Sequence, residues 1–355
     1  MARVTPKPDA AGPGFWHRQA IYVALAMFAA FADLRLIILW MPKAFLLSAG
    51  VADGVVRGEP MWRVYQSRVL GPWLVHALSA FMSPGVAYAW FVFAVLFASG
   101  YGVLRFTQEL RDRTRPPVLS FLIFHLAILF LMPCLWLYPW DLVSVLTFTV
   151  FNFLVLKRAR WGWFAALYAV AVFNHEMALV IAGWLVVDAL VQLGQKRGRA
   201  GARGRGAWAQ LWIGAGLLAA GLVVIEALRT TLLVRETQSP QDLPPGVVYG
   251  GSFHFSLVQN WRTAVSYWTL SVPDGFAFLV PLFLLMVVVL ALLLARAGWS
   301  RFGALSVVLL VMVAALLCFG LVFETRVQLP LVPFVAMNAW GAFRRRVVSS
   351  AVADG

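Results

Sequence analysis

Long apolar runs separated by short basic breaks are the feature that most constrains the fold of this chain. The runs occupy residues 19–41, 85–106, 117–137, 141–156, 162–173, 177–194, 207–228, 274–295, 302–323 and 327–343. A membrane-spanning helix needs about 20 predominantly apolar residues, so the pattern predicts an all-α polytopic membrane protein with about ten transmembrane helices. Only 12% of the 355 residues are charged, and no polar stretch is long enough to form a soluble core. Residues 1–355 are therefore expected to form a single membrane domain.

The basic residues predict how the chain is oriented. A formal net charge of +14 would suit nucleic-acid binding in a soluble protein. Here most lysines and arginines lie in the breaks between apolar runs, and the positive-inside rule places such segments in the cytoplasm. The pattern argues against a nucleic-acid partner and predicts cytoplasmic termini, 1–18 and 344–355. The basic loop 195–206 is expected to lie against anionic lipid head groups.

Two longer connections are predicted on the outer side. Residues 42–84 must lie wholly outside, with one or two interfacial helices, because a crossing there would place the basic residues 105–115 outside. Residues 162–194 have basic flanks at both ends, so they are expected to cross outward and return. Residues 229–273 contain several prolines and glycines and form the second large outer loop.

Four polar groups from distant parts of the chain fall at this predicted outer face. They are Asp53 with Arg68, then Asp141, the turn Asn174-His175-Glu176, and Glu324 with Arg326. Ionisable groups near hydrocarbon are costly and are usually functional or paired. Arginine forks match phosphate oxygens, and neighbouring carboxylates can act as a base or hold a divalent metal. The pattern favours an anionic, lipid-linked ligand.

Each of these groups also has a structural interpretation. Asp53 with Gly54 suits an ordinary turn, and Asp141 suits the capped first turn of a helix, where aspartate is favoured. The Asn174–Glu176 turn and the Glu324–Arg326 pair suit polar helix ends without further function.

Charges inside or near the apolar runs have structural roles as their first interpretation. Asp33 is expected to pair with Arg35 or with a neighbouring helix, although it is also a rival catalytic carboxylate. His125, within a run, favours a hydrogen bond between helices over a ligand role. Glu226 and Arg229, three residues apart, are expected to pair on one helix face.

The layout resembles the GT-C superfamily of polytopic glycosyltransferases, which use polyprenyl-phosphate sugars. The motifs that carry the resemblance are Asp53 in the first outer loop, the stretch Arg68-Val69-Leu70-Gly71-Pro72-Trp73, the element Tyr138-Pro139-Trp140-Asp141 with Asn174-His175-Glu176, and Glu324-Thr325-Arg326 leading into Pro330 and Pro333. The resemblance covers most of the chain in layout, and its motifs are short. The chain has no Asp-x-Asp pair in the first loop.

The resemblance implies a small bacterial enzyme of the inner membrane that transfers a sugar, with inversion, on the outer face. By this analogy Asp53 is the base that deprotonates an acceptor hydroxyl, and Asp141 and Glu176 position the sugar. Any divalent metal, Mg or Mn, would use Asp53 and Asp141. The residues implied to hold the phosphate and donor are Arg68, Asn174, His175, Glu324 and Arg326. Apart from the resemblance, the position of His254 in the second outer loop makes it a candidate for acceptor contact.

Other functions remain open from the sequence. A transporter or flippase of a lipid-linked glycan predicts charges along a membrane path, and Asp33, Arg35 and His125 are the main candidates. A non-catalytic scaffold subunit would use the basic inner surface. A polymerase or ligase acting on polyprenyl-linked glycans would share the same outer site.

Overall fold

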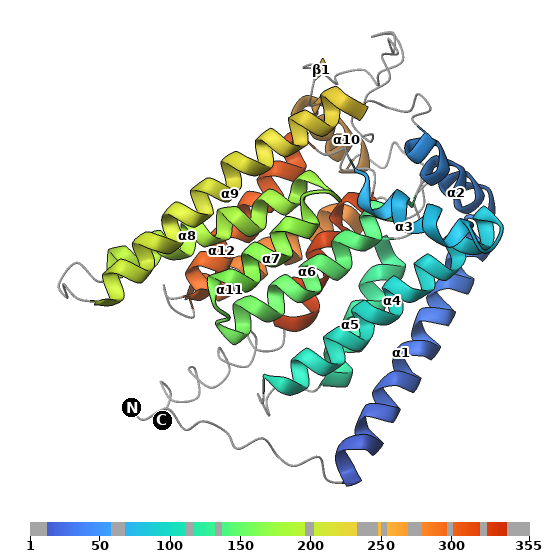
Figure 1. Cartoon of the computed structure of the whole chain (residues 1–355), viewed down its shortest axis with the longest axis horizontal. Helices are drawn as coiled ribbons and strands as arrows, with labels where there is room; N and C mark the ends of the chain where they lie inside the picture. Colours follow the sequence, from blue (N-terminus) through green and yellow to red (C-terminus); the bar gives the residue numbers. More distant parts are fainter. Residues whose placement is uncertain are drawn as a thin grey trace.

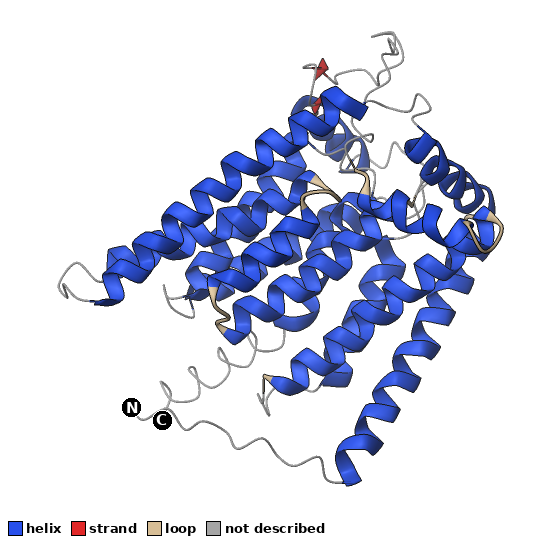
Figure 2. Ribbon diagram, viewed as in Figure 1, coloured by secondary structure: helices blue, strands red, loops and turns tan. Residues whose placement is uncertain are grey.

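The fold is a bundle of helices, seen in a computed structural model of the chain (Figures 1 and 2). The structure describes residues 13–57, 68–110, 117–131, 137–195, 202–232, 248–249, 254–268, 279–296, 301–319 and 325–338. Among these residues the helices are α1 (Pro13–Trp40), α2 (Pro42–Arg57), α3 (Leu70–Ser79), α4 (Pro84–Glu109), α5 (Pro117–Leu131), α6 (Pro139–Lys157), α7 (Trp161–Ala171), η1 (Glu176–Ala178), α8 (Leu179–Gln195), α9 (Ala202–Leu232), α10 (Leu257–Trp268), α11 (Leu279–Arg296), α12 (Arg301–Phe319) and η3 (Thr325–Leu331). Two short strands, β1 (Val248–Tyr249) and β2 (His254–Phe255), pair antiparallel.

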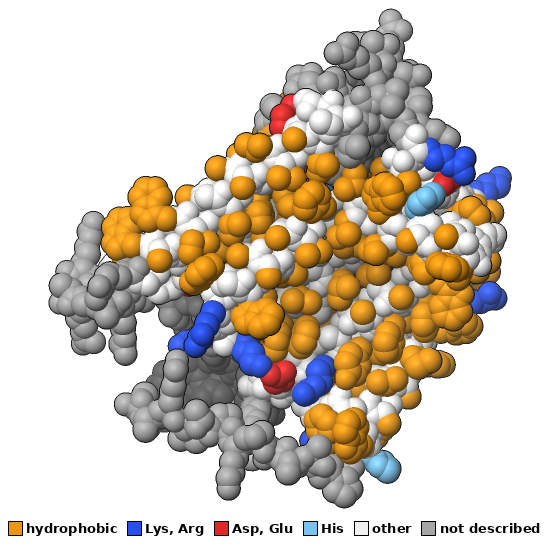
Figure 3. Space-filling view, in the orientation of Figure 1, with side chains coloured by type: hydrophobic (Ala, Val, Ile, Leu, Met, Phe, Trp, Pro, Cys, Tyr) orange, Lys and Arg blue, Asp and Glu red, His pale blue; other side chains and the backbone are white. Residues whose placement is uncertain are grey.

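Apolar composition supports the expectation of a polytopic membrane protein. Within the described residues, five helices are long and apolar enough to cross a membrane: Phe15–Trp40, Pro84–Glu109, Pro139–Lys157, Glu176–Gly194 and Gly206–Thr231. Shorter apolar helices are Pro117–Leu131, Trp161–Ala171, Phe283–Ala295 and Ala304–Phe319. Figure 3 shows apolar side chains covering the middle of the visible face, with described charges gathered toward its two ends. Such a surface suits lipid, since water-soluble monomers rarely expose apolar patches of this extent.

Each of the ten predicted apolar runs contains a helical segment, but several segments are short. α5 and α7 have 15 and 11 residues, below the about 20 that span a bilayer. The last run begins as the 3-10 helix η3, which contains Pro330, and continues as helix over residues 332–338. Proline removes a backbone donor and disfavours a regular α-helix there. Five spans are supported by length and composition, and ten remains a prediction.

The predicted first outer loop, residues 42–84, contains two helices, α2 and α3, in the described parts. α2 follows α1 after the single residue Met41, and the Met41 amide donates to the Ile37 carbonyl. Figure 1 shows α2 and α3 together at one end of the bundle. α3 packs against both α2 and α6. The described parts of this loop therefore form a helical cap beside the start of α6.

α6 is the most enclosed long helix and organises the core. Its aromatic residues Phe148 and Phe151 contact Phe164 of α7, Trp184 of α8 and Phe334 of the last helix. Hydrogen bonds also fix how the chain after η3 is aligned along α6. The Asn152 amide donates to the Pro333 carbonyl at 3.3 Å, and the Asn338 amide donates to Asn152 Oδ1 at 3.1 Å. These bonds hold the chain after η3 along α6.

A polar pair also lies between α1 and α5, inside the described part of the bundle. Asp33 Oδ2 of α1 is 2.5 Å from His125 Nδ1 of α5, and both side chains are buried. His125 therefore links two helices, as the sequence favoured, and Asp33 pairs with a neighbouring helix. Gly100 of α4 faces the ring, since an added Cβ would lie 2.7 Å from His125 Nε2. Three helices thus meet at this pair.

Candidate functional site

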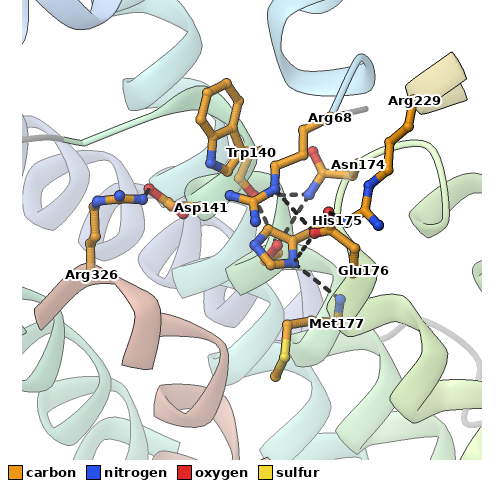
Figure 4. A network of polar contacts seen from close by, with 10 residues as sticks. Arg68, Trp140, Asp141, Asn174, His175, Glu176, Met177, Arg229 and Arg326 are labelled. Carbon is orange, nitrogen blue, oxygen red and sulfur yellow. Dashed lines mark hydrogen bonds and ion pairs between the residues drawn. The ribbon is translucent and has the colours of Figure 1, made fainter. Parts of the chain in front are cut away.

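Five charged side chains from five segments meet at one end of the bundle (Figure 4). Arg68 precedes α3, Asp141 lies in the first turn of α6, Glu176 begins η1, Arg229 lies in the last turn of α9, and Arg326 lies in η3. Helices joined by short turns run antiparallel, so the start of α6, the α7–α8 turn and the end of α9 share one end of the bundle. The topology therefore collects residues that are far apart in the sequence.

Glu176 bridges two of the arginines. Its Oε2 accepts from Arg68 Nε at 3.1 Å, and its Oε1 accepts from Arg229 Nη2 at 2.9 Å. The three side chains are 11 to 22% exposed. Charge-assisted hydrogen bonds of this kind are stronger than neutral ones and fix the orientation of the guanidinium plane. The buried Nε of Arg229 has no hydrogen-bond partner within the described chain, so this donor can serve a ligand.

Asp141 and Arg326 form a second, more deeply buried pair. Arg326 Nη1 donates to Asp141 Oδ2 at 3.0 Å, and the side chains are only 2% and 4% exposed. Asp141 also accepts from the Tyr138 backbone amide at 3.2 Å, which completes a capping box at the start of α6. The capping interpretation of Asp141 is thus confirmed, and the same carboxylate orients Arg326. The Arg326 guanidinium lies 4.4 Å from the Tyr138 ring centre, within cation–π range.

The α7–α8 turn ties the two pairs together. The Asn174 side-chain amide donates to the Trp140 carbonyl at 2.8 Å and to Ser144 Oγ at 3.1 Å. Arg68 lies 5.7 Å from the Trp140 ring centre. Trp140 stacks on Tyr138 with ring centres 4.5 Å apart, so the rings beside Arg68 and Arg326 are in contact. The five charges therefore belong to one site.

Backbone contacts position Arg68. The amides of Val69 and Leu70 both donate to the Phe173 carbonyl, at 3.0 and 2.9 Å. Gly71 lies so close to the start of α6 that an added Cβ would be 2.8 Å from the Pro139 carbonyl carbon and the Trp140 nitrogen. Real Cβ atoms do not approach backbone this closely, so only glycine lets α3 pack here.

His175 is neutral in this site. Its Nδ1 accepts from the Met177 backbone amide at 3.0 Å. Burial lowers the pKa of His175 from 6.5 to about 3, with further lowering by Arg68, Arg326 and Arg229, while Glu176 acts in the opposite direction. Three guanidinium groups against two carboxylates then leave one net positive charge. The described site is therefore suited to an anion.

The pKa of His175 predicts how stability depends on pH. Because the folded-state pKa is depressed, the unfolded chain binds a proton between pH 6.5 and about 3 that the folded chain does not. Stability should fall as pH falls below 6.5, by about 2 kcal/mol at pH 5. Unfolding by SDS titration at pH 7.5 and 5 should show a smaller loss for His175→Asn than for wild type. An equal loss in both proteins would contradict the assignment, and the exposed His17→Asn serves as control.

Other predicted residues fall outside this network. Asp53, on α2, pairs with Arg57 at 2.7 Å and lies 3.5 Å from His76 of α3. Its role as a base stays a prediction. Glu324 lies outside the described residues. His254 lies in β2, opposite Tyr249 of β1, and only its backbone is described.

Arg229 is the site residue that the sequence interpretation missed. The expected partner was Glu226 on the same helix, but Arg229 contacts Glu176, which lies between α7 and α8. Its place in the last turn of α9, before the second large outer loop, was the available signal. The spacing of three residues favoured Glu226 as the partner, whereas the fold places Arg229 beside Glu176, which is less exposed.

The donor set does not fit the divalent metal that the resemblance implied. No group of three or more His, Cys, Asp or Glu side chains within the described residues is arranged to hold a metal ion. The two candidate ligands have different partners, since Asp141 pairs with Arg326 and Asp53 pairs with Arg57. A guanidinium beside each carboxylate repels a second cation.

Comparison with known proteins adds no relative, since no protein family, curated protein or solved structure matches the chain. The arrangement of the charged side chains is therefore what indicates a function.

Proposed function

We propose that the chain is a membrane glycosyltransferase that moves a sugar from a polyprenyl-phosphate donor to an acceptor on the outer face. The observation that carries this proposal is the convergence of Arg68, Arg229 and Arg326 at one end of an apolar helix bundle. A polyprenyl phosphate has an apolar tail for the lipid and an anionic head for such a site. The motif-level resemblance to the GT-C superfamily points to the same class of substrate.

The chemistry asked of the arginines is electrostatic. Transfer of a sugar from a phosphodiester releases a phosphomonoester, which gains negative charge as the bond to the anomeric carbon breaks. Preorganised donors stabilise charge that develops in the transition state, and they are most effective in a site shielded from water. Glu176 and Asp141 hold the guanidinium groups in place, so that little reorganisation is needed when the charge appears.

Arg229→Gln tests the proposal in cells. A deletion strain complemented with wild type should recover an envelope glycan seen by mass spectrometry, whereas Arg229→Gln should form it about 10²-fold more slowly, the effect of removing one such donor. Arg262→Gln is the matched control, because Arg262 is an exposed arginine on α10. The helix α10 is itself hydrogen-bonded to the last turns of α12. Arg262→Gln should restore the glycan fully.

Two results would count against the enzyme. A deletion strain with an unchanged glycan profile would remove the basis of the proposal. Full complementation by Arg229→Gln, at equal membrane abundance, would favour a scaffold subunit, because a scaffold does not need a charged outer site.

Transport of a lipid-linked glycan is the second candidate, and the buried Asp33–His125 pair favours it. Ionisable pairs within spans are common in proton-coupled transporters. The two candidates differ in what Asp33→Asn should do. A transporter that uses the pair would lose activity, whereas an enzyme with its chemistry at the outer arginines would keep it.

A further inference from the structure

A backbone hydrogen bond determines which ring nitrogen of His175 carries the proton. Nδ1 accepts from the Met177 amide at 3.0 Å, and an amide N–H can only donate. A neutral imidazole has one acceptor nitrogen and one donor nitrogen, so the proton lies on Nε2 when Nδ1 accepts. His175 therefore presents an N–H donor on the ring edge that faces away from Met177.

The ring of His175 lies within the arginine site. Its Nδ1 is 3.4 Å from Glu176 Oε2, the oxygen that accepts from Arg68 Nε at 3.1 Å. Figure 4 shows the ring between Glu176 and Asp141, with the edge that carries Nε2 on the side of Asp141. The side chain is 20% exposed, and within the described residues no hydrogen bond occupies Nε2. A ligand held by the arginines is therefore next to this donor.

The surroundings of the ring keep the imidazole neutral. The charged groups around it are three guanidiniums and two carboxylates: Arg68, Arg229, Arg326, Glu176 and Asp141. Burial is the largest cause that lowers the pKa of His175 to about 3, the guanidiniums act in the same direction, and Glu176 acts against them. A bound anion raises the pKa of a neighbouring imidazole by about 1 to 3 pH units, which still leaves His175 neutral above pH 6.5.

We infer that His175 donates Nε2–H, as an uncharged group, to a phosphate oxygen of the bound lipid head group; this rests on the proposed function. The bond adds a donor to the guanidiniums of the site without adding a charge. Binding through this donor takes up no proton. The affinity of the site for a lipid phosphodiester, which keeps one negative charge, should therefore not change over the pH range in which an ordinary histidine beside a phosphate titrates.

The test measures binding of a polyprenyl methyl phosphate, a phosphodiester, to the purified protein in nanodiscs of zwitterionic lipid. Wild type should bind with the same affinity at pH 6.5 and 8.5. His175→Ala should bind about 10- to 100-fold more weakly, the usual effect of losing a hydrogen bond to a charged group. His175→Gln retains an uncharged N–H donor and should bind about as tightly as wild type, with the same flat pH profile.

His17→Ala is the matched control, because His17 is an exposed histidine at the N-terminal end of α1. It should bind as wild type does. Wild-type affinity that rises as pH falls, with no such rise in His175→Gln, would show that His175 binds as a cation and would overturn the inference. Unchanged affinity in His175→Ala would overturn it as well. If His175→Ala does not fold, His175→Gln decides, and weak binding by that variant would contradict an uncharged donor.

The same measurement separates this inference from the proposed function. Wild type that binds the phosphodiester, with the expected effects at His175, but forms no envelope glycan in cells would contradict the glycosyltransferase and leave the His175 contact standing. A glycan that depends on Arg229, together with unchanged binding in His175→Ala, would contradict only the role of His175. A folded wild type that does not bind the phosphodiester would overturn both.

Discussion

Asp141→Asn should lower the free energy of unfolding by about 3–5 kcal/mol, the usual cost of removing one member of a buried ion pair. Asp141 and Arg326 are almost fully enclosed, so the substitution leaves a guanidinium in a site that water reaches poorly. The asparagine side chain still offers an oxygen to the Tyr138 amide, so the cap of α6 is largely kept. SDS titration of the purified protein in mixed micelles measures the loss.

A double substitution identifies the cause. Asp141→Leu with Arg326→Met removes both charges, and apolar replacement of a whole buried pair is often neutral or stabilising. The double variant should therefore recover most of the stability lost in Asp141→Asn while remaining inactive. If the double variant is as unstable as the single one, the loss comes from the cap or from packing, and the ion pair is not the cause.

The sequence predicted which helix ends carry polar residues better than it predicted which of these residues pair with one another. Asp141, the Asn174–Glu176 turn and Arg326 were identified because charged residues are rare beside apolar runs. Their pairing depends on the antiparallel order of the helices and on the short α7–α8 turn, which no local pattern encodes. The pairing of Arg229 with Glu176 instead of Glu226 shows the limit, since spacing reveals local neighbours only.

Asp53 illustrates the same limit from the other direction. The family resemblance implied that Asp53 is the base, which stays a prediction, and the fold gives Asp53 two partners, Arg57 and His76. His76 lies in an apolar stretch, and the sequence alone does not indicate that it pairs with Asp53. Only the packing of α2 on α3 brings the imidazole and the carboxylate together. The apolar runs predicted about ten spanning helices, whereas length and composition support five within the described residues.

Glu176→Gln should reduce sugar transfer by about 10²-fold without weakening the binding of polyprenyl monophosphate. The reason is that Glu176 does two opposed things. It orients Arg68 and Arg229, which transfer requires, and it cancels positive charge, which opposes anion binding. Replacing the carboxylate raises the net charge of the described site from one to two positive charges. Binding is measured in nanodiscs and transfer by the envelope-glycan profile.

Glu226→Gln is the control, since Glu226 is an exposed carboxylate three residues before Arg229 on α9. It should leave both measurements unchanged. Unchanged transfer in Glu176→Gln would mean that the arginines need no carboxylate to orient them. Weaker binding would mean that the bound state of polyprenyl monophosphate depends more on the orientation of the arginines than on the net charge of the site. Only the combination of kept binding and lost transfer fits a carboxylate whose task is to hold guanidinium groups ready for charge that develops later, in the transition state.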